Sequence, residues 1–498
     1  MEFLDPAKQM RHRVILWVGY ILVAIGIVIA TLVLLYQAYG FGLGKNGQVI
    51  QNGLVFFSSQ PHPAKIYLNG KLSKEQTNAR IALPSGIYRV ELERGGYRTW
   101  QRTIEVEGGD VQHFDYPLLV PSKLTSKKLA GFAGVPGLAI QSPDQRWLLV
   151  QKPNSMTSFS LYDLKAPAKA PVDIDLPASL LTKAVHQNWQ LDEWADDNKH
   201  ILLQHNYDGK REFILVDRTD SSKSQNLDKA LSTDPAKLSL INKKYDQYYL
   251  YDSSAASLRK ATLGSPAPVP VLDHVLNYQS YSDDTLLYAT DTGAPAGKVL
   301  VKLKIGDKTY PVRTFPASPA GSAYLLNLTE YSGTLYLAVG SANTDKVYIY
   351  KDPVGQLHKL PNHALVPSQV LHVPAPNYVS FSNNAQFIMA ESGKNFGVYD
   401  IENEKGYNYK MDRSLDKPQL HADWIDGNRM TYVSGGKVLM FDYDGTNKQT
   451  LVSDSPLYLP AFAPDFKFVY TLAPDVSKGS VPGQTNLDQT SLLIPTDQ

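Results

Sequence analysis

The sequence predicts a chain that is all-β apart from one N-terminal transmembrane helix, with a small β-sandwich followed by a β-propeller. Three observations lead to this fold class. Residues 14–36 carry no charge, a short stretch of alternating residues follows them, and most of the remaining chain repeats one strand–turn–strand phrase. The 30 Tyr, 34 Gly and 32 Pro suit strands joined by many turns.

Composition excludes several classes of function. Lys and Arg total 49 against 48 Asp and Glu, which leaves a net charge of +1. Nucleic-acid binding calls for a basic surface, so no nucleic-acid partner is expected. The chain has no cysteine, which excludes disulfides, thiolate metal sites, a Cys nucleophile and a lipid anchor attached through cysteine.

The apolar segment begins at Val14 and ends at Tyr36. As a helix it is ~35 Å long, enough to cross a ~30 Å hydrocarbon layer. Three cations, Lys8, Arg11 and Arg13, precede it, so the positive-inside rule places residues 1–13 in the cytoplasm and the bulk of the chain outside.

A cleaved signal peptide is the alternative interpretation of this segment. The apolar region of a signal peptide is normally much shorter, and no convincing small-x-small cleavage site follows here. We therefore expect an uncleaved single-pass anchor in the cell membrane. The Gly- and Asn-rich residues 37–52 are expected to form a spacer.

Residues 53–120 alternate in hydrophobicity and contain two strong turn signals. Asn69-Gly70 in "AKIYLNGK" is a two-residue hairpin signal. In "LPSGIYRVEL", Pro84 and Gly86 flank a loop residue, and Tyr88 and Val90 then share one face of a strand. The pattern predicts a compact antiparallel sandwich, near the lower size limit for independent folding.

The run from Pro84 to Val90, "PSGIYRV", is similar to the core string of the PEGA domain, Pro-Glu-Gly-x-(aromatic or His)-x-Val, with Ser85 in place of the usual Glu. PEGA domains are small β-sandwiches of bacterial and archaeal surface proteins. The resemblance covers residues 53–120 and implies a spacer or adhesive module without catalysis. Tyr97 and Trp100 are expected in its core rather than in an exposed patch, because so small a sandwich needs large apolar residues.

After a linker at 121–130, residues 131–498 repeat a phrase of a polar turn followed by two apolar strands. The aligned turn residues are Asp144, Asp197, Asp246, Asp284, Gly333, Asn384, Asp426 and Asp465. Neighbouring turns are 38 to 53 residues apart, a spacing that suits four-stranded propeller blades. The count predicts eight blades. Seven is the alternative, if the first or last copy is half a blade closed by the other terminus.

Two copies carry a family resemblance. "SPDQRWLLV" resembles the start of TolB-like and WD-repeat-like blades, and "DYDGTNKQTL" resembles the strand–Asp-Gly turn–strand ending of a TolB-like blade. The resemblance is architectural. It implies a propeller that binds proteins across a face, although enzymes are built on propellers as well.

No motif for catalysis, metal or cofactor binding stands out. His200 with His205, and His358 with His363, lack the helical spacing of metalloprotease ligands and are read as ordinary histidines. The run from Asp442 through Asp444 to Asn447 lacks the terminal Glu of a calcium loop, so a hairpin turn is the simpler reading.

Two further patterns have simple explanations. Ser414 and Lys417 match one element of a penicillin-binding site without its two companions. The acid pairs at 196–197 and 283–284 fall on predicted turns. A glycosidase role for such acids stays open as an alternative, because the two carboxylates of a glycosidase come together only in the folded chain.

We therefore expect a membrane-anchored cell-surface protein without a cofactor. Its propeller is predicted to bind a cell-envelope or neighbouring-cell protein or glycan, and no enzymatic activity is expected. The alternative is an extracellular propeller hydrolase or lyase acting on envelope glycans.

Overall fold

The computed structural model describes residues 6–38, 41–43, 49–265, 267–318, 323–359, 364–417, 420–476 and 482–497. The chain divides into two compact units. The first contains Met1–Lys123 together with Ile494–Asp497, and the second contains Leu124–Leu493. Within the predicted propeller range 131–498, residues 494–497 therefore group with the first unit.

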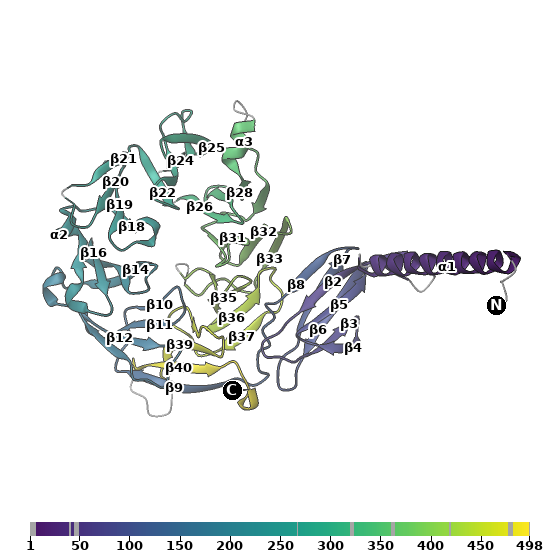
Figure 1. The fold of residues 1–498 in the computed structure, drawn as a ribbon. Coiled ribbons are helices and arrows are strands. Elements are labelled where there is room, and N and C mark those ends of the chain that lie inside the picture. The colour runs from purple at the N-terminus through teal and green to yellow at the C-terminus, as the bar shows by residue number, and fades with distance from the viewer. Residues whose placement is uncertain are drawn as a thin grey trace. The chain divides into compact units, whose positions relative to one another are not determined.

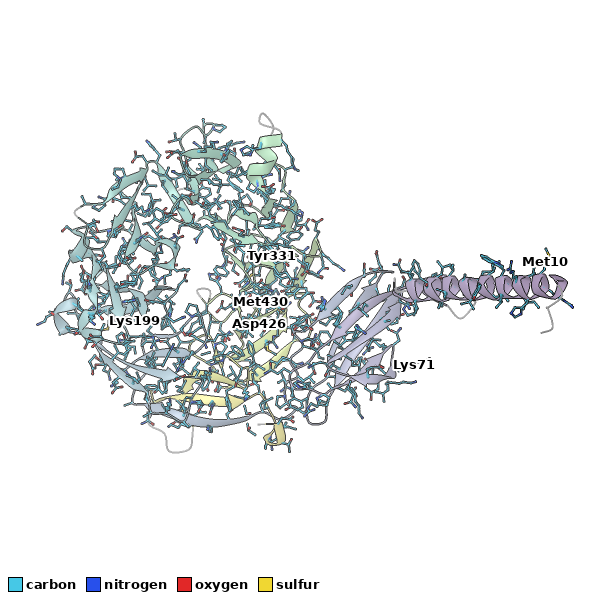
Figure 2. The ribbon with its side chains drawn as sticks, in the orientation of Figure 1. Met10, Lys71, Lys199, Tyr331, Asp426 and Met430 are labelled. Atoms are coloured by element: carbon cyan, nitrogen blue, oxygen red, sulfur yellow. The ribbon has the colours of Figure 1, made fainter. Side chains whose placement is uncertain are left out.

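The first unit begins with helix α1, Pro6–Ala38 (Figure 1). Within it, Met10–Tyr36 has a mean hydropathy of 2.8 and no buried residue, so by length and composition it could cross a membrane. Val14 and Tyr36, the predicted ends of the anchor, lie inside this stretch. Met10, near the start of the helix, is labelled in Figure 2.

Two four-stranded sheets follow α1. The first contains β1 (Phe41–Leu43), β2 (Val49–Phe57), β5 (Ala79–Pro84) and β8 (Val111–Phe114). The second contains β3 (Lys65–Leu68), β4 (Lys71–Gln76), β6 (Gly86–Glu93) and β7 (Trp100–Val106).

Two expectations for this region need correction. The predicted spacer 37–52 already contains β1 and the start of β2, because main-chain pairing with a neighbouring strand does not require apolar side chains. The sandwich is also not wholly antiparallel, since β2 pairs with β8 in parallel.

The core of the sandwich contains the aromatic residues that the sequence places there. Trp100 is 2% exposed and Tyr97 is 7% exposed, and both pack with Val90 in one apolar cluster. The β3–β4 connection is the predicted two-residue hairpin turn, with φ of +51° at Asn69 and +76° at Gly70. Lys71 follows this turn (Figure 2).

Among the described residues, the second unit has eight four-stranded antiparallel sheets. Blades 1 to 3 are β10 (Ala139–Gln141), β11 (Trp147–Gln151), β12 (Ser158–Asp163) and β13 (Val172–Asp175); β14 (Gln187–Trp194), β15 (His200–Tyr207), β16 (Lys210–Asp217) and β17 (Gln225–Asn226); and β18 (Lys237–Leu240), β19 (Gln247–Asp252), β20 (Ser257–Thr262) and β21 (Val269–Leu272).

Blades 4 to 6 are β22 (Val275–Ser280), β23 (Thr285–Thr290), β24 (Lys298–Ile305) and β25 (Lys308–Pro316); β26 (Tyr324–Tyr331), β27 (Thr334–Ser341), β28 (Lys346–Lys351) and β29 (Gln369–His372); and β30 (Tyr378–Phe381), β31 (Phe387–Ser392), β32 (Asn395–Asp400) and β33 (Lys405–Lys410). Blade 7 is β34 (Asp423–Trp424), β35 (Arg429–Ser434), β36 (Lys437–Asp442) and β37 (Gln449–Val452). Short helices α2 (Leu227–Leu231) and α3 (Pro353–Lys359) lie in connections.

Blade 8 is completed by a strand from the other end of the unit. Its order is β38 (Ala461–Phe462), β39 (Phe468–Pro474), β40 (Thr485–Ser491) and β9 (Thr125–Phe132). The predicted linker 121–130 is therefore wrong, because most of it is strand β9.

The eight sheets form a closed ring (Figure 1). Apolar clusters join blades 1–2, 2–3, 3–4, 4–5, 5–6 and 8–1. Phe387 stacks on Trp424 between blades 6 and 7, and the Arg429 guanidinium lies 4.9 Å from the Phe466 ring between blades 7 and 8. The prediction of eight blades is confirmed and the seven-blade alternative is wrong.

The aligned turn residues mark the connection between the first and second strand of each blade. In five blades the side-chain oxygen accepts a hydrogen bond from the main-chain N–H two residues later. The five residues are Asp144, Asp197, Asn384, Asp426 and Asp465. Such Asx turns explain why Asp and Asn recur at this position.

Replacing Trp100 tests its role in the core. Trp100→Ala should lower the free energy of unfolding by about 3–5 kcal/mol, because it leaves a cavity in the sandwich. Circular dichroism in urea would measure this loss, with Leu72→Ala, at an exposed position, as a control that changes stability by less than about 0.5 kcal/mol. A well-folded Trp100→Ala protein that has lost partner binding would contradict the core assignment.

Candidate functional site

The first strand of each blade lies at the free inner edge of its sheet, and side chains from neighbouring blades bond to these edges. Three such contacts are Asn277 Nδ2 to the Tyr324 carbonyl (2.8 Å), Asn327 Nδ2 to the Val379 carbonyl (3.1 Å) and Gln141 Nε2 to the Phe462 carbonyl (2.6 Å). Unpaired edge groups would otherwise need water or another chain. These amide side chains are therefore structural.

Two pockets that share wall residues, called here the two lobes of the central cavity, lie against the inner strands of blades 2 to 6. One lobe, of about 350 Å³, is lined from β14, β18 and β22, and the other, of about 520 Å³, is lined mainly from β18, β22, β26 and β30. Lys237, Tyr278 and Gln279 contribute to the walls of both lobes. Because the inner strands of successive blades line these lobes, the cavity lies on the axial side of the ring.

Asp192 lies in the wall of the smaller lobe with a partly buried side chain whose Oδ2 is buried. It sits where the pairing of β14 with β15 shifts register between Leu191 and Glu193, a bulge that re-aims the side chain. Within the described part of the chain, its buried Oδ2 has no hydrogen-bond partner. Burial raises the pKa of Asp192 to about 7, against the opposing effect of Lys237.

Lys237 lies beside it at the start of β18. Its Nζ is 4.6 Å from the centre of the Tyr278 ring and donates a long hydrogen bond of 3.4 Å to the Tyr278 carbonyl. Burial lowers the pKa of Lys237, and the nearby charges of Asp192 and Glu193 partly offset this effect. Two desolvated groups of opposite charge therefore line one lobe.

Other polar groups in the walls already have partners. Glu193 accepts from the Leu240 N–H at 2.8 Å and pairs with Lys243. The Tyr278 hydroxyl bonds Ser239 Oγ at 2.8 Å. Both side chains are therefore held by contacts within the propeller.

A second group of titratable side chains lies towards blade 7. Tyr378, which lines the larger lobe, stacks on His421 with ring centres 4.1 Å apart. His421 Nδ1 is 3.2 Å from Oε1 of the buried Glu391. Asp423 on β34 is exposed to solvent, and desolvation by the surrounding protein raises its pKa to about 6.

The residues predicted from the PEGA resemblance lie together in the sandwich. Pro84 ends β5 and Gly86 begins β6. The Tyr88 hydroxyl donates to the Pro84 carbonyl at 2.9 Å, which ties the strand to the turn, and Val90 is fully buried. These contacts are those of a folding element.

His200 and His205 do not come together as a site. His200 and His205 lie on β15 an odd number of residues apart, so their side chains point to opposite faces. His200 Nδ1 contacts Asp197 at 2.6 Å, and His205 Nδ1 contacts Glu212 at 2.8 Å. His358 lies in α3, and His363 lies outside the described residues.

The remaining patterns are also explained locally. Asn447 Nδ2 donates to Asp442 Oδ2 at 2.8 Å, as expected of a hairpin turn. The Ser414 carbonyl accepts from Ser434, while Lys417 Nζ donates to the Leu457 carbonyl. In the acid pairs, Asp197 and Asp284 both accept hydrogen bonds within their turns. Across the described ranges, no group of three or more His, Asp or Glu suits a metal ion.

Sequence reasoning missed Asp192 and Lys237. The available signal was weak: a charged residue inside "LDEW" and another at the start of "KLSL", each in a segment that forms an inner strand. Asp192 and Lys237 come together only because blades 2 and 3 pack side by side, and no local sequence pattern predicts that contact.

Comparison with known proteins identifies one domain. Residues 52–120 match the family model of the PEGA domain, so the sandwich of the first unit is a PEGA domain. No curated protein matches the sequence.

Several solved structures are similar to this chain at low sequence identity. Hsv2p of Kluyveromyces lactis is 12% identical over 71% of this chain and 97% of its own, with a TM-score of 0.35. The Cps50 (Swd1) propeller domain of Myceliophteria thermophila is 13% identical over 64% and 97%, with a TM-score of 0.38. An oligogalacturonate lyase in complex with manganese is 11% identical over 75% and 99%, with a TM-score of 0.36. None of their activities is assigned to this chain.

The raised pKa of Asp192 predicts a pH-dependent effect of Asp192→Asn. A carboxyl group with a pKa of about 7 when folded and 3.8 when unfolded costs no stability below pH 4 and progressively more as the pH rises to 7. The variant should therefore match the wild type at pH 4 and exceed it at pH 8 by on the order of 1–2 kcal/mol, after allowance for solvent access. Urea unfolding across this range measures the difference, with Asp307→Asn at an exposed turn as the control. A difference that is constant with pH would contradict the assignment.

Proposed function

We propose that this is a membrane-anchored cell-surface protein whose extracytoplasmic propeller binds a protein or glycan partner in the central cavity. The PEGA domain acts as a spacer or adhesive module between membrane and propeller. The partner belongs to the cell envelope or to a neighbouring cell.

The observation that carries this proposal is that, among the described residues, Asp192 Oδ2 is buried and accepts no hydrogen bond. A buried carboxylate oxygen without a donor is costly in a folded protein, and a ligand that donates to it recovers that cost on binding. Lys237 beside it supplies a cation for an anionic or carbonyl group of the same ligand. Concave, partly apolar sites with a few such polar groups are typical of ligand sites.

The exposed apolar stretch Met10–Tyr36 supports anchoring. It is long enough to span a bilayer and longer than the apolar region of most signal peptides. We infer that it remains attached, with residues 1–13 in the cytoplasm, and the PEGA domain agrees with a location at the cell surface.

Anchoring is tested on protein expressed in cells. The full chain should remain in the membrane fraction after carbonate washing, and mass spectrometry should find an uncut N-terminal peptide. A chain that lacks residues 1–40 should be soluble. Release of a mature protein that begins after Tyr36 would instead identify the segment as a signal peptide.

Binding is tested by affinity capture from envelope extract with residues 50–498. The wild type should capture a defined partner, and Asp192→Asn with Lys237→Met should lower capture by about tenfold or more, because both polar groups of the cavity are lost. Asp307→Asn with Lys308→Met removes one charge of each sign at an exposed turn and serves as the matched control. Equal capture by wild type and cavity variant would contradict the use of this cavity.

Asp192 and Lys237 also support the alternative, a hydrolase or lyase that acts on envelope glycans. A carboxyl group with a pKa near 7 beside a lysine with a lowered pKa suits proton transfer at neutral pH. Formation of new reducing or unsaturated ends from the extract, abolished by Asp192→Asn alone, would favour the enzyme over the binding protein.

A further inference from the structure

The four residues Ile494–Asp497, called here the return segment, belong to the first unit although they follow the last propeller strand. They pack on the PEGA sandwich through a carboxylate. Arg94 donates to both oxygens of Asp497, from Nη2 to Oδ1 at 2.5 Å and from Nε to Oδ2 at 3.2 Å. The Tyr97 hydroxyl donates to Oδ2 at 2.7 Å. A bidentate guanidinium contact with a third donor is a specific way to hold a carboxylate.

The other end of the segment is held as well. The Ile494 N–H donates to the Tyr97 hydroxyl at 3.0 Å, so this one hydroxyl bonds both ends of the segment. The Ile494 side chain packs against the apolar cluster of the sandwich. A Cβ added to Gly96, whose φ is +84°, would lie 3.2 Å from Ile494 Cδ1, so glycine leaves room for this side chain. The Asp497 N–H closes a turn on the Ile494 carbonyl at 2.9 Å.

The ion pair is more enclosed than an ordinary surface pair. The side chains of Arg94 and Asp497 are 22% and 13% exposed, and Arg94 Nη1 also donates to the Pro63 carbonyl at 2.6 Å. The hydrogen bond from Arg94 holds the pKa of Asp497 below its usual value. Burial, with Asp497 contributing, raises the pKa of Tyr97 to about 12, so its hydroxyl keeps its proton at neutral pH.

The sandwich surface extends past the return segment. A cavity of about 730 Å³ is lined by Ile494, Thr496 and Asp497 and by sandwich residues that include Lys65, Gln76 and Glu93. The sandwich therefore has a cleft of mixed polar and apolar lining, and the anchored return segment forms part of its wall.

We propose that the PEGA sandwich is a receptor for a peptide of the form Ile-x-x-Asp, and that its occupant is the return segment of the same chain. Arg94 and Tyr97 donate hydrogen bonds to the Asp carboxylate, and the Ile side chain lies over Gly96. This assigns the sandwich a peptide-binding site in addition to its role as a spacer or adhesive module.

Docking of this peptide also affects the propeller through the chain itself. Only Leu492 and Leu493 separate β40 from the return segment, and only Leu124 separates the first unit from β9. The two strands that close blade 8 are thus both tethered to the sandwich, one by the main chain and one by the docked peptide. Tethering two partners keeps their effective concentration high, so an occupied receptor opposes separation of β9 from β40.

The test uses the full chain, residues 1–498, in detergent. Carboxypeptidase should release residues 494–498 at least about tenfold faster from Asp497→Asn and from Arg94→Met than from the wild type, because a charge-assisted bidentate contact is lost. The double variant should be no faster than either single variant, since both remove one interaction. Asp307→Asn, the same change at an exposed turn of the propeller, is the matched control and should behave as the wild type. Unchanged release from Asp497→Asn would overturn the proposal.

A second measurement separates a receptor from a merely stabilising contact. A chain ending at Leu493 should bind the added labelled peptide Ile-Pro-Thr-Asp-Gln, and should bind it at least about tenfold more weakly when Asn replaces Asp. Failure of the truncated but folded chain to bind the peptide at millimolar concentration would overturn the receptor assignment. A wild-type dimer that dissociates on Asp497→Asn would show that the occupant comes from a second copy, which contradicts docking within one chain.

Discussion

Pairing of β9 with β40 is the contact on which the propeller depends. Thr125 pairs with Ser491 and Phe132 with Thr485, so residues from the two ends of the second unit form adjacent strands. This pairing gives blade 8 its fourth strand, and Leu487 of β40 then packs with Leu148 of blade 1. The entropic cost of joining distant segments grows only slowly with their separation, so one strand pair and one apolar interface are enough to close a large ring. Closure in turn fixes the inner strands around the central cavity.

Local sequence patterns predicted the elements that repeat. Asp and Asn recur at the first turn of the blades because the same side-chain-to-N–H bond forms there, and apolar alternation marks the second and third strands. Strand β9 was mistaken for a linker because it is an outer edge strand. Its first four residues, including Lys127 and Lys128, are exposed, and lysines on an edge discourage pairing with other chains. The feature that protects this edge is the one that makes it resemble a linker.

The candidate site was harder to predict, because its residues lie on different blades and gain their properties from packing. Burial alone does not mark Asp192 as functional, since the propeller also buries Glu212. Glu212 accepts from the Thr182 N–H at 2.7 Å, from Asn226 Nδ2 at 2.8 Å and contacts His205, and these hydrogen bonds hold its pKa below the usual value. Asp192 and Glu212 are both acids on strands of blade 2. Only their hydrogen bonds distinguish Glu212, which has several donors, from Asp192, whose Oδ2 has none among the described residues.

That distinction also bears on the choice between binding and catalysis. A general acid or base in an enzyme is normally oriented by a second group, as a carboxylate orients a histidine in a catalytic triad. Asp192 Oδ2 lacks such a group within the described residues, and Glu193, the neighbouring acid, is committed to Leu240 and Lys243. Folding has already removed water from this oxygen, and no protein group donates to it. A ligand donor therefore adds a hydrogen bond without a further desolvation cost at the oxygen. We therefore propose that this site holds a donor group of a ligand rather than moving a proton.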